Sequence, residues 1–141
     1  MNSVRQSAEN AVFFIPEVEM GIPLAWAEIP RLVREIGPAL TRELVMTCRR
    51  FTPAEMKQAG FMNRVVPASQ LEGEVAGLVR DLLAKPSVPV AITKEHVNAI
   101  TRVMGAGLTG FGDADALYAA TRDEESRAAA NAYRNRALKS D

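Results

Sequence analysis

Apolar positions along this chain mostly recur at spacings of three and four residues, which is typical of helices that bury one face. Two short segments depart from that pattern. Residues 11–15 (AVFFI) form an unbroken apolar run ended by Pro16, which predicts a buried strand, and residues 63–67 predict a second, brief strand. A strand needs hydrogen-bonded neighbours, and Val65 and Val66 offer only a short one. The pattern therefore predicts a mainly α-helical chain with a few short strands, which belong to a sheet completed elsewhere.

Glycine, proline and capping residues mark where the predicted helices begin and end. Gly37 ends a short helix over residues 31–36, and Pro38 opens the next one. Residues 52–55 (TPAE) are a capping box with proline at the first helical position, and Gly60 ends that helix. Further helices are predicted from capping boxes at residues 69–72 and 121–124, over about residues 88–104, and from Asp113 to about Ala120. The helix after residues 69–72 carries one apolar stripe, made up of Leu71, Val75, Leu78, Val79, Leu82 and Leu83.

Composition places the chain among ordinary globular proteins. Its 141 residues are 48% hydrophobic and 24% charged, which suits a single domain. Seventeen basic residues balance 17 acidic ones, so the net charge argues against a nucleic-acid partner. No apolar run is long enough to span a bilayer, and the N-terminal residues lack the apolar core of a secretory signal. We therefore expect a cytoplasmic protein that binds neither nucleic acid nor membrane.

Side chains that carry common catalytic or metal chemistry are scarce. Cys48 is the only cysteine and His96 the only histidine, so a zinc site or a histidine-activated nucleophile would lack its partners. We expect Cys48 to be a small buried residue and His96 to be a solvated or boundary residue on a helix. Residues 105–110 (GAGLTG) match a dinucleotide-binding pattern, but the residues before them are helical in pattern, so we expect a loop between helices. No metal or separate cofactor is predicted.

Glu17 is the foremost candidate for chemistry, because it directly follows the predicted buried strand and Pro16. A partly desolvated carboxylate held there, at the edge of a pocket, would serve as a general acid or base. The alternative is an exposed glutamate in a turn, which is the more frequent case on spacing alone. Glu19 is an equal candidate on chemistry. Trp26, the only tryptophan, would either wall a pocket or pack in the core.

Four segments of the chain resemble, in order, motifs of the crotonase superfamily, the enoyl-CoA hydratases and isomerases. Residues 14–23 (FIPEVEMGIP) resemble F-x-x-P-E-[VI]-x-x-G-x-x-P, and residues 30–37 (PRLVREIG) are similar to R-L-x-R-x-x-G. Residues 59–67 (AGFMNRVVP) resemble A-x-x-x-G-L-V-N-x-V-V-P, and residues 93–98 (TKEHVN) resemble T-K-x-x-[VI]-N. The resemblance begins near Ala8 and covers only the second half of the family's usual chain.

The resemblance implies the C-terminal half of a crotonase-like spiral of β-β-α turns, followed by a helical trimerisation region. Residues 1–66 would be the remnant of the spiral core, and residues 67–141 the helical oligomerisation region. Family members add water across, or shift, the double bond of an acyl-CoA thioester, whose coenzyme A arrives as part of the substrate. Two backbone N–H groups form their oxyanion hole. Glu17 falls on the second of the two glutamates that hydratases of the family use as acid and base.

The chain also departs from the family pattern. Ala27 and Glu28 stand where the family has glycines, and Glu28 adds a carboxylate near the acyl pocket; Pro23, Trp26 and Glu28 are predicted to bind substrate. The oxyanion hole and the other glutamate belong to the half that is absent, so we expect an incomplete protein, inactive without a separate N-terminal half. The alternative is a non-catalytic oligomerisation module or a truncated remnant. Under both interpretations, exposed apolar faces predict a homo-oligomer, and the resemblance implies a trimer or a multiple of it.

Overall fold

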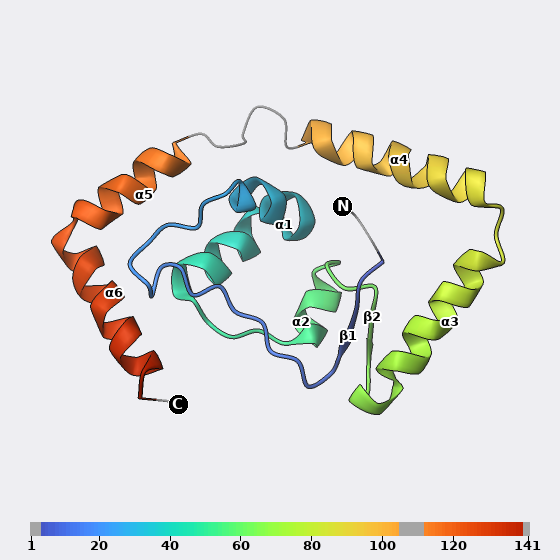
Figure 1. Ribbon diagram of the computed structural model, residues 1–141, viewed down its shortest axis with the longest axis horizontal. Helices are drawn as coiled ribbons and strands as arrows, with labels where there is room; N and C mark the ends of the chain where they lie inside the picture. Colours follow the sequence, from blue (N-terminus) through green and yellow to red (C-terminus); the bar gives the residue numbers. More distant parts are fainter. Residues whose placement is uncertain (1–3, 105–111, 140–141) are drawn as a thin grey trace. The chain divides into compact units, whose positions relative to one another are not determined.

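The computed structural model describes residues 4–104 and 112–139, and helices predominate in them, as expected (Figure 1). The described elements are β1 (Gln6–Ala8), α1 (Glu28–Thr47), α2 (Pro53–Gln58), β2 (Arg64–Val66), the 3₁₀ helix η1 (Ala68–Gln70), α3 (Leu71–Leu83), α4 (Ser87–Met104), α5 (Asp113–Arg122) and α6 (Glu124–Ala137). They form two compact units: the first combines Met1–Phe13 with Phe51–Ala106, and the second combines Phe14–Arg50 with Gly107–Asp141. The functional division expected at residue 66 stays a prediction.

The first unit contains a parallel pair of strands. β1 lies beside β2, in the register that places Ser7 opposite Val65. Arg5 secures the start of β1, because its backbone N–H donates to Asn63 Oδ1 at 2.7 Å and its guanidinium carbon lies 4.2 Å from the centroid of the Phe61 ring. The predicted brief second strand is therefore confirmed, and its partner is a segment that the apolar pattern does not mark.

The strand predicted over residues 11–15 is wrong. In this segment Phe13 makes one antiparallel backbone bridge, to Phe51, and the two rings stack with their centroids 5.7 Å apart. The neighbouring side chains of Val12 and Phe14 are 57% and 47% exposed. An unbroken apolar run indicates a strand that is covered on both faces, and such cover is missing here among the described residues. A single bridge does not make a ladder, so the segment is extended without being a strand.

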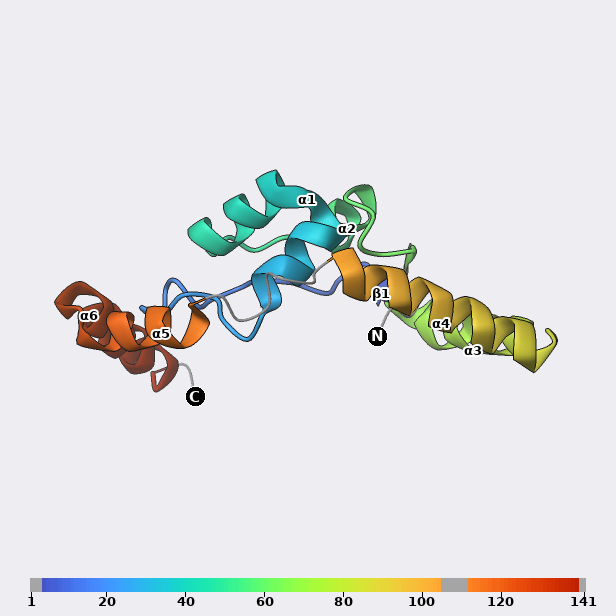
Figure 2. The same cartoon turned by 90° about the horizontal axis from the view of Figure 1, so that it is seen from above.

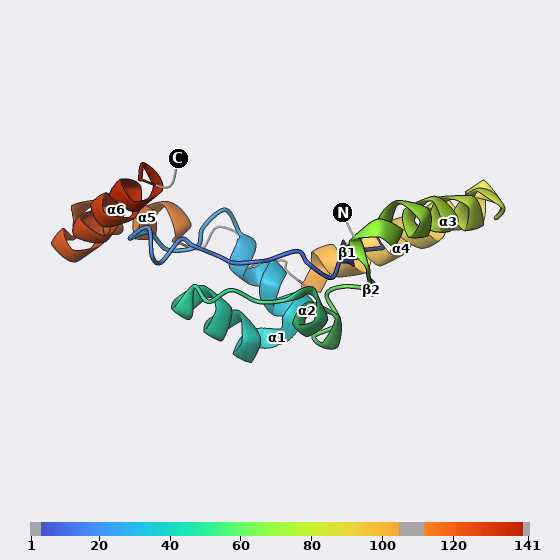
Figure 3. The same cartoon turned by 90° about the horizontal axis from the view of Figure 1, so that it is seen from below.

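Helix α1, in the second unit, consists of two helical segments that meet at a bend (Figures 2 and 3). The bend is at Gly37, whose φ of 78° and ψ of 162° lie outside helical space, and Pro38 follows it. Glycine adopts this backbone at little cost because it lacks a Cβ, so the predicted boundary at Gly37 and Pro38 is confirmed. The second segment ends at Cys48, which is buried as expected. The other buried residues of this segment are Thr41, Leu44 and Val45.

The three predicted capping boxes have different outcomes. At α2, Thr52 Oγ1 accepts the Glu55 backbone N–H at 3.2 Å, and the Glu55 carboxylate accepts the Thr52 backbone N–H at 2.8 Å, so this box is confirmed. The box at residues 69–72 is wrong, because the 3₁₀ turn before α3 already has helical backbone angles and no side chain caps the helix. At α6 the cap is Asp123, two residues later than predicted, and its carboxylate accepts the Ser126 backbone N–H at 2.8 Å.

Helices α3 and α4 leave their apolar faces exposed. Figure 1 shows that they meet at their connecting turn and diverge instead of packing side by side. No residue of α3 is buried, and Leu83 in its predicted apolar stripe is 79% exposed. On α4, Asn98 is buried, and His96 is exposed as expected. The loop predicted over residues 105–110 lies outside the described residues.

Candidate active site

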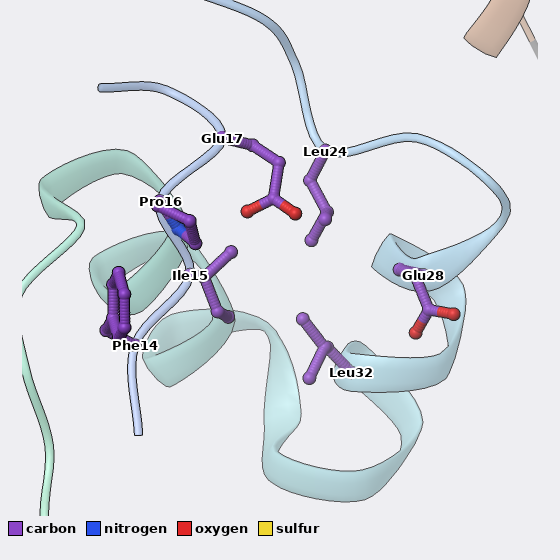
Figure 4. Close-up of a pocket in the computed structure, with 7 residues that line it drawn as sticks. All are labelled: Phe14, Ile15, Pro16, Glu17, Leu24, Glu28 and Leu32. Atoms are coloured by element: carbon purple, nitrogen blue, oxygen red, sulfur yellow. The ribbon is translucent and has the colours of Figure 1, made fainter. Parts of the chain in front are cut away.

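A pocket of about 240 Å³ in the second unit contains Glu17 (Figure 4). Its lining comes from residues 14–17, from the chain leading to α1, and from the N-terminal part of α1. Apolar side chains make up most of the wall, and two carboxylates interrupt it. The lining residues are Phe14, Ile15, Pro16, Glu17, Leu24, Glu28 and Leu32.

A hydrogen-bonded turn after Pro16 positions Glu17. The Met20 backbone N–H donates to the Pro16 carbonyl oxygen, and the Ile22 backbone N–H donates to the Glu17 carbonyl oxygen, both at 3.0 Å. Proline itself restricts the backbone of the residue before it. Figure 4 shows the Glu17 carboxylate pointing into the pocket, toward Leu24. The main chain around Glu17 is thus held on both sides, and the carboxylate has a defined direction.

The Glu17 carboxylate has an unused hydrogen-bonding atom. Its Oε2 is buried and has no hydrogen-bond partner among the described residues. Leaving a buried polar atom unpaired costs about 1–3 kcal/mol, and more for a charged group. Native proteins rarely accept this cost without a reason, and a catalytic role is one of the reasons. Glu17 therefore offers a hydrogen-bond acceptor, or a donor when protonated, to a molecule that enters the pocket.

The wall opposite Glu17 is the N-terminal part of α1. Glu28 is the first residue of that helix and Leu32 follows four residues later, so both side chains lie on the same helix face. Glu28 accepts a hydrogen bond from Arg31 Nη1 at 2.8 Å, and the two side chains are 36% and 60% exposed, respectively. Glu28 is thus a partly solvated carboxylate at the rim with a cation beside it, unlike the buried oxygen of Glu17.

The sequence predicts four residues for the site, and the pocket brings together two of them, Glu17 and Glu28. Pro23 is half-buried and Trp26 is 68% exposed, and neither is among the residues that line this pocket. Their role in substrate binding stays a prediction. Leu24 and Leu32 were not expected. The sequence predicts that this helix starts at Arg31, whereas α1 begins three residues earlier, at Glu28. Only with this earlier start do Glu28 and Leu32 both belong to a helix, where their spacing of four residues places them on one face.

This arrangement supports proton transfer to or from a group held in an apolar cavity. The described ranges contain no cluster of three or more His, Cys, Asp or Glu side chains with the geometry of a metal site. None of the helices in them has both the length and the apolar character needed to cross a membrane.

A family model with the description enoyl-CoA hydratase/isomerase matches residues 2–138. The match extends over nearly the whole chain and includes the four segments that resemble the family's motifs. The chain therefore belongs to the enoyl-CoA hydratase/isomerase family, within the crotonase superfamily.

Two curated relatives illustrate how much of a family member this chain represents. It is 34% identical over 93 residues to a probable mitochondrial enoyl-CoA hydratase of Dictyostelium discoideum, which covers 66% of this chain and 34% of the relative. It is 34% identical over 96 residues to a carnitinyl-CoA dehydratase of Salmonella paratyphi A, which covers 68% of this chain and 37% of the relative. Over these matches the chain spans about a third of the length of its curated relatives.

Solved structures show the same fold over a larger share of the chain. An enoyl-CoA hydratase from Mycobacterium avium subsp. paratuberculosis superposes with a TM-score of 0.81 at 23% identity, covering 95% of this chain and 54% of that one. A probable enoyl-CoA hydratase from Mycobacterium thermoresistibile gives a TM-score of 0.67 at 32% identity, covering 73% of this chain and 41% of that one. The described elements thus correspond to part of the crotonase fold. That this part is the C-terminal half, with a trimerisation region, stays a prediction.

Proposed function

We propose that this chain supplies an acid–base glutamate and an acyl-binding pocket to an enzyme that hydrates the double bond of an enoyl-CoA thioester. One observation carries the proposal: the buried Oε2 of Glu17 has no partner among the described residues, in a pocket that is otherwise mostly apolar. The position of Glu17 in the family's P-E motif and the family membership of the chain support the substrate class.

The pocket suits the acyl end of such a substrate. Its volume of about 240 Å³ is below the roughly 300–1,000 Å³ typical of sites for drug-sized ligands, so it would admit a short acyl group and leave the coenzyme A outside. In hydration, the oxygen of water bonds to the β-carbon, a proton is added to the α-carbon, and the π bond between these carbons is consumed. Glu17 would carry a proton on Oε2, as acid or as base, at one of these steps.

We propose that the chain is inactive alone and becomes active with a separate polypeptide corresponding to the N-terminal half of the family fold. That half would supply the oxyanion hole. Removal of one oxyanion-hole donor costs about 10²–10³ in kcat, so an enzyme that lacks both donors loses most of its rate. The short span of the chain relative to its curated relatives supports this proposal.

The test is hydration of crotonyl-CoA. The reaction is monitored as the decrease in absorbance of the conjugated thioester. We expect no turnover from the chain alone. We expect turnover from the complemented enzyme, which is the chain mixed with an N-terminal half from a family member. Glu17→Gln should lower kcat of the complemented enzyme by about 10²–10⁴, the usual contribution of a general acid or base. Glu19→Gln is the matched control, because Glu19 is 49% exposed and lies 3.7 Å from Arg136. Full activity in Glu17→Gln, or an equal loss in Glu19→Gln, would contradict the assignment.

We also propose that the chain self-associates, as a trimer or a multiple of it, through α3 and α4. Leu83 on α3 is 79% exposed and Val103 on α4 is 72% exposed, and such apolar faces favour association. Light scattering at micromolar concentrations should give three times the chain's 15.3 kDa, or a multiple of that trimer mass. Leu83→Glu should lower that mass without unfolding the chain, because the side chain is exposed. A monomeric mass for the unaltered protein would refute the proposal.

A further inference from the structure

The turn that precedes α1 has an unusual backbone. Trp26 and Ala27 are consecutive non-glycine residues in left-handed conformation, with φ values of 59° and 58°. L-residues adopt this conformation at a cost, so surrounding contacts must hold it. The Glu28 backbone N–H donates to the Ala25 carbonyl oxygen at 3.2 Å, which closes the turn on itself. Ala25 is 1% exposed, so one end of the turn is anchored in the interior.

A second anchor comes from a residue 86 positions away. The Ala27 backbone N–H donates to Asp113 Oδ2 at 2.9 Å, a hydrogen bond to a charged acceptor, which is stronger than one between neutral groups. Asp113 is the first residue of α5, and that helix has no side-chain cap. Its carboxylate is therefore bonded to the Trp26–Ala27 turn and does not cap its own helix. Both partners belong to the second unit.

The turn determines where α1 begins. Ala27 is the residue at the N-terminal end of that helix, Glu28 follows it, and Leu32 lies one helical turn further. Glu28 and Leu32 are the α1 side of the Glu17 pocket. A change in the backbone at Ala27 would move this wall, whereas Glu17 is positioned by a different turn.

We propose that Asp113 is a positioning residue for the acyl pocket: it holds the left-handed Trp26–Ala27 turn and thereby sets the position of the wall formed by Glu28 and Leu32. This inference rests on the proposed function, because it takes the pocket to be the acyl-binding site. It gives one residue of α5, Asp113, a role in substrate binding, although no residue of α5 lines the pocket. Asp113 acts through the turn and does not touch the substrate.

Three variants separate this role from a general effect on folding. Asp113→Ala removes the acceptor, and Asp113→Asn restores an amide oxygen at the same place. Asp115→Ala removes another first-turn carboxylate of α5, which is exposed. In the full chain, amide hydrogen exchange at Ala27 should become about ten-fold faster in Asp113→Ala, as expected when a protecting hydrogen bond is lost. It should be largely restored in Asp113→Asn and unchanged in Asp115→Ala. Unchanged exchange in Asp113→Ala would overturn the proposal.

The functional readout uses crotonyl-CoA and the complemented enzyme. Asp113→Ala should raise KM about three- to ten-fold with kcat within about two-fold, because a displaced wall weakens binding of the acyl group while Glu17 stays in place. Glu17→Gln should instead lower kcat and leave KM nearly unchanged. Faster exchange at Ala27 with unchanged KM would overturn the positioning role and leave the proposed function intact. An unaltered complemented enzyme without turnover would overturn the proposed function, and with it the positioning role.

Discussion

Replacing Gly21 by alanine tests the contact between the Glu17 turn and helix α6, both in the second unit. Gly21 closes this turn, since its backbone N–H donates to the Val18 carbonyl oxygen at 3.0 Å, and its φ is +73°. A Cβ at this position would overlap the Ser126 carbonyl oxygen and lie 2.8 Å from its carbonyl carbon. These are backbone atoms of α6, so no side-chain rotation relieves the overlap.

The expected size of the effect follows from three contributions to the free energy of unfolding. A left-handed backbone costs an alanine about 1–2 kcal/mol. Overlap with atoms that cannot move aside costs about 1–3 kcal/mol. Alanine also restricts the unfolded chain, and this raises the free energy of unfolding by about 0.4–1 kcal/mol. We therefore expect Gly21→Ala to lower the free energy of unfolding by roughly 1–5 kcal/mol.

Urea denaturation of the full chain measures this change, and two glycines provide controls. Gly60 has a φ of +81°, and a Cβ added there would meet nothing within 4 Å, so Gly60→Ala reports the backbone cost and the unfolded-chain contribution without the overlap. Gly73 lies within α3 with open space around it, so Gly73→Ala should stabilise by about 0.5–1 kcal/mol. If Gly21→Ala destabilises no more than Gly60→Ala, then α6 does not lie against the Glu17 turn, and the reasoning is wrong.

Three further outcomes are expected. Thr52→Ala should lower the free energy of unfolding by about 0.5–2 kcal/mol in the same assay, because the confirmed capping box is lost; an unchanged value would contradict the cap. Ala27→Gly should raise it by about 0.5–1 kcal/mol, because glycine relieves the φ of 58°, and a decrease would contradict the strain at this turn. Hydrogen bonds from the Ser126 backbone N–H, and then from its side chain, lower the pKa of Asp123 below 3.8. A carboxyl group whose pKa is depressed by folding stabilises above its unfolded pKa and loses this contribution as the pH falls through its folded pKa. Circular dichroism between about pH 5 and about pH 2 should therefore show a loss of α6 helicity that is smaller in Asp123→Asn; identical pH profiles would refute this role.

Features that depend on near neighbours could be predicted from the sequence. The bend at Gly37 and the capping box of Thr52 and Glu55 involve atoms within one turn of chain, so residue type and spacing are sufficient. The choice of Glu17 as a candidate also follows from its place after Pro16 and in the P-E motif. Family membership was likewise predictable, because four short segments resemble the family's motifs in order, and the family model matches residues 2–138.

Pairings between distant segments were decided only by the tertiary structure. Gln6 lies opposite Arg64, and Asp113 bonds to Ala27 across 86 residues, and no local pattern signals either contact. The tertiary structure also distinguishes Glu17 from Glu19, which are equal candidates for acid–base chemistry by residue type. Folding places Glu19 near Arg136 in solvent, whereas it buries an oxygen of Glu17 without a partner among the described residues. Sequence determined which residues could do chemistry, but only the packing of the chain decided which carboxylate is available for it, because burial and pairing are properties of the folded environment.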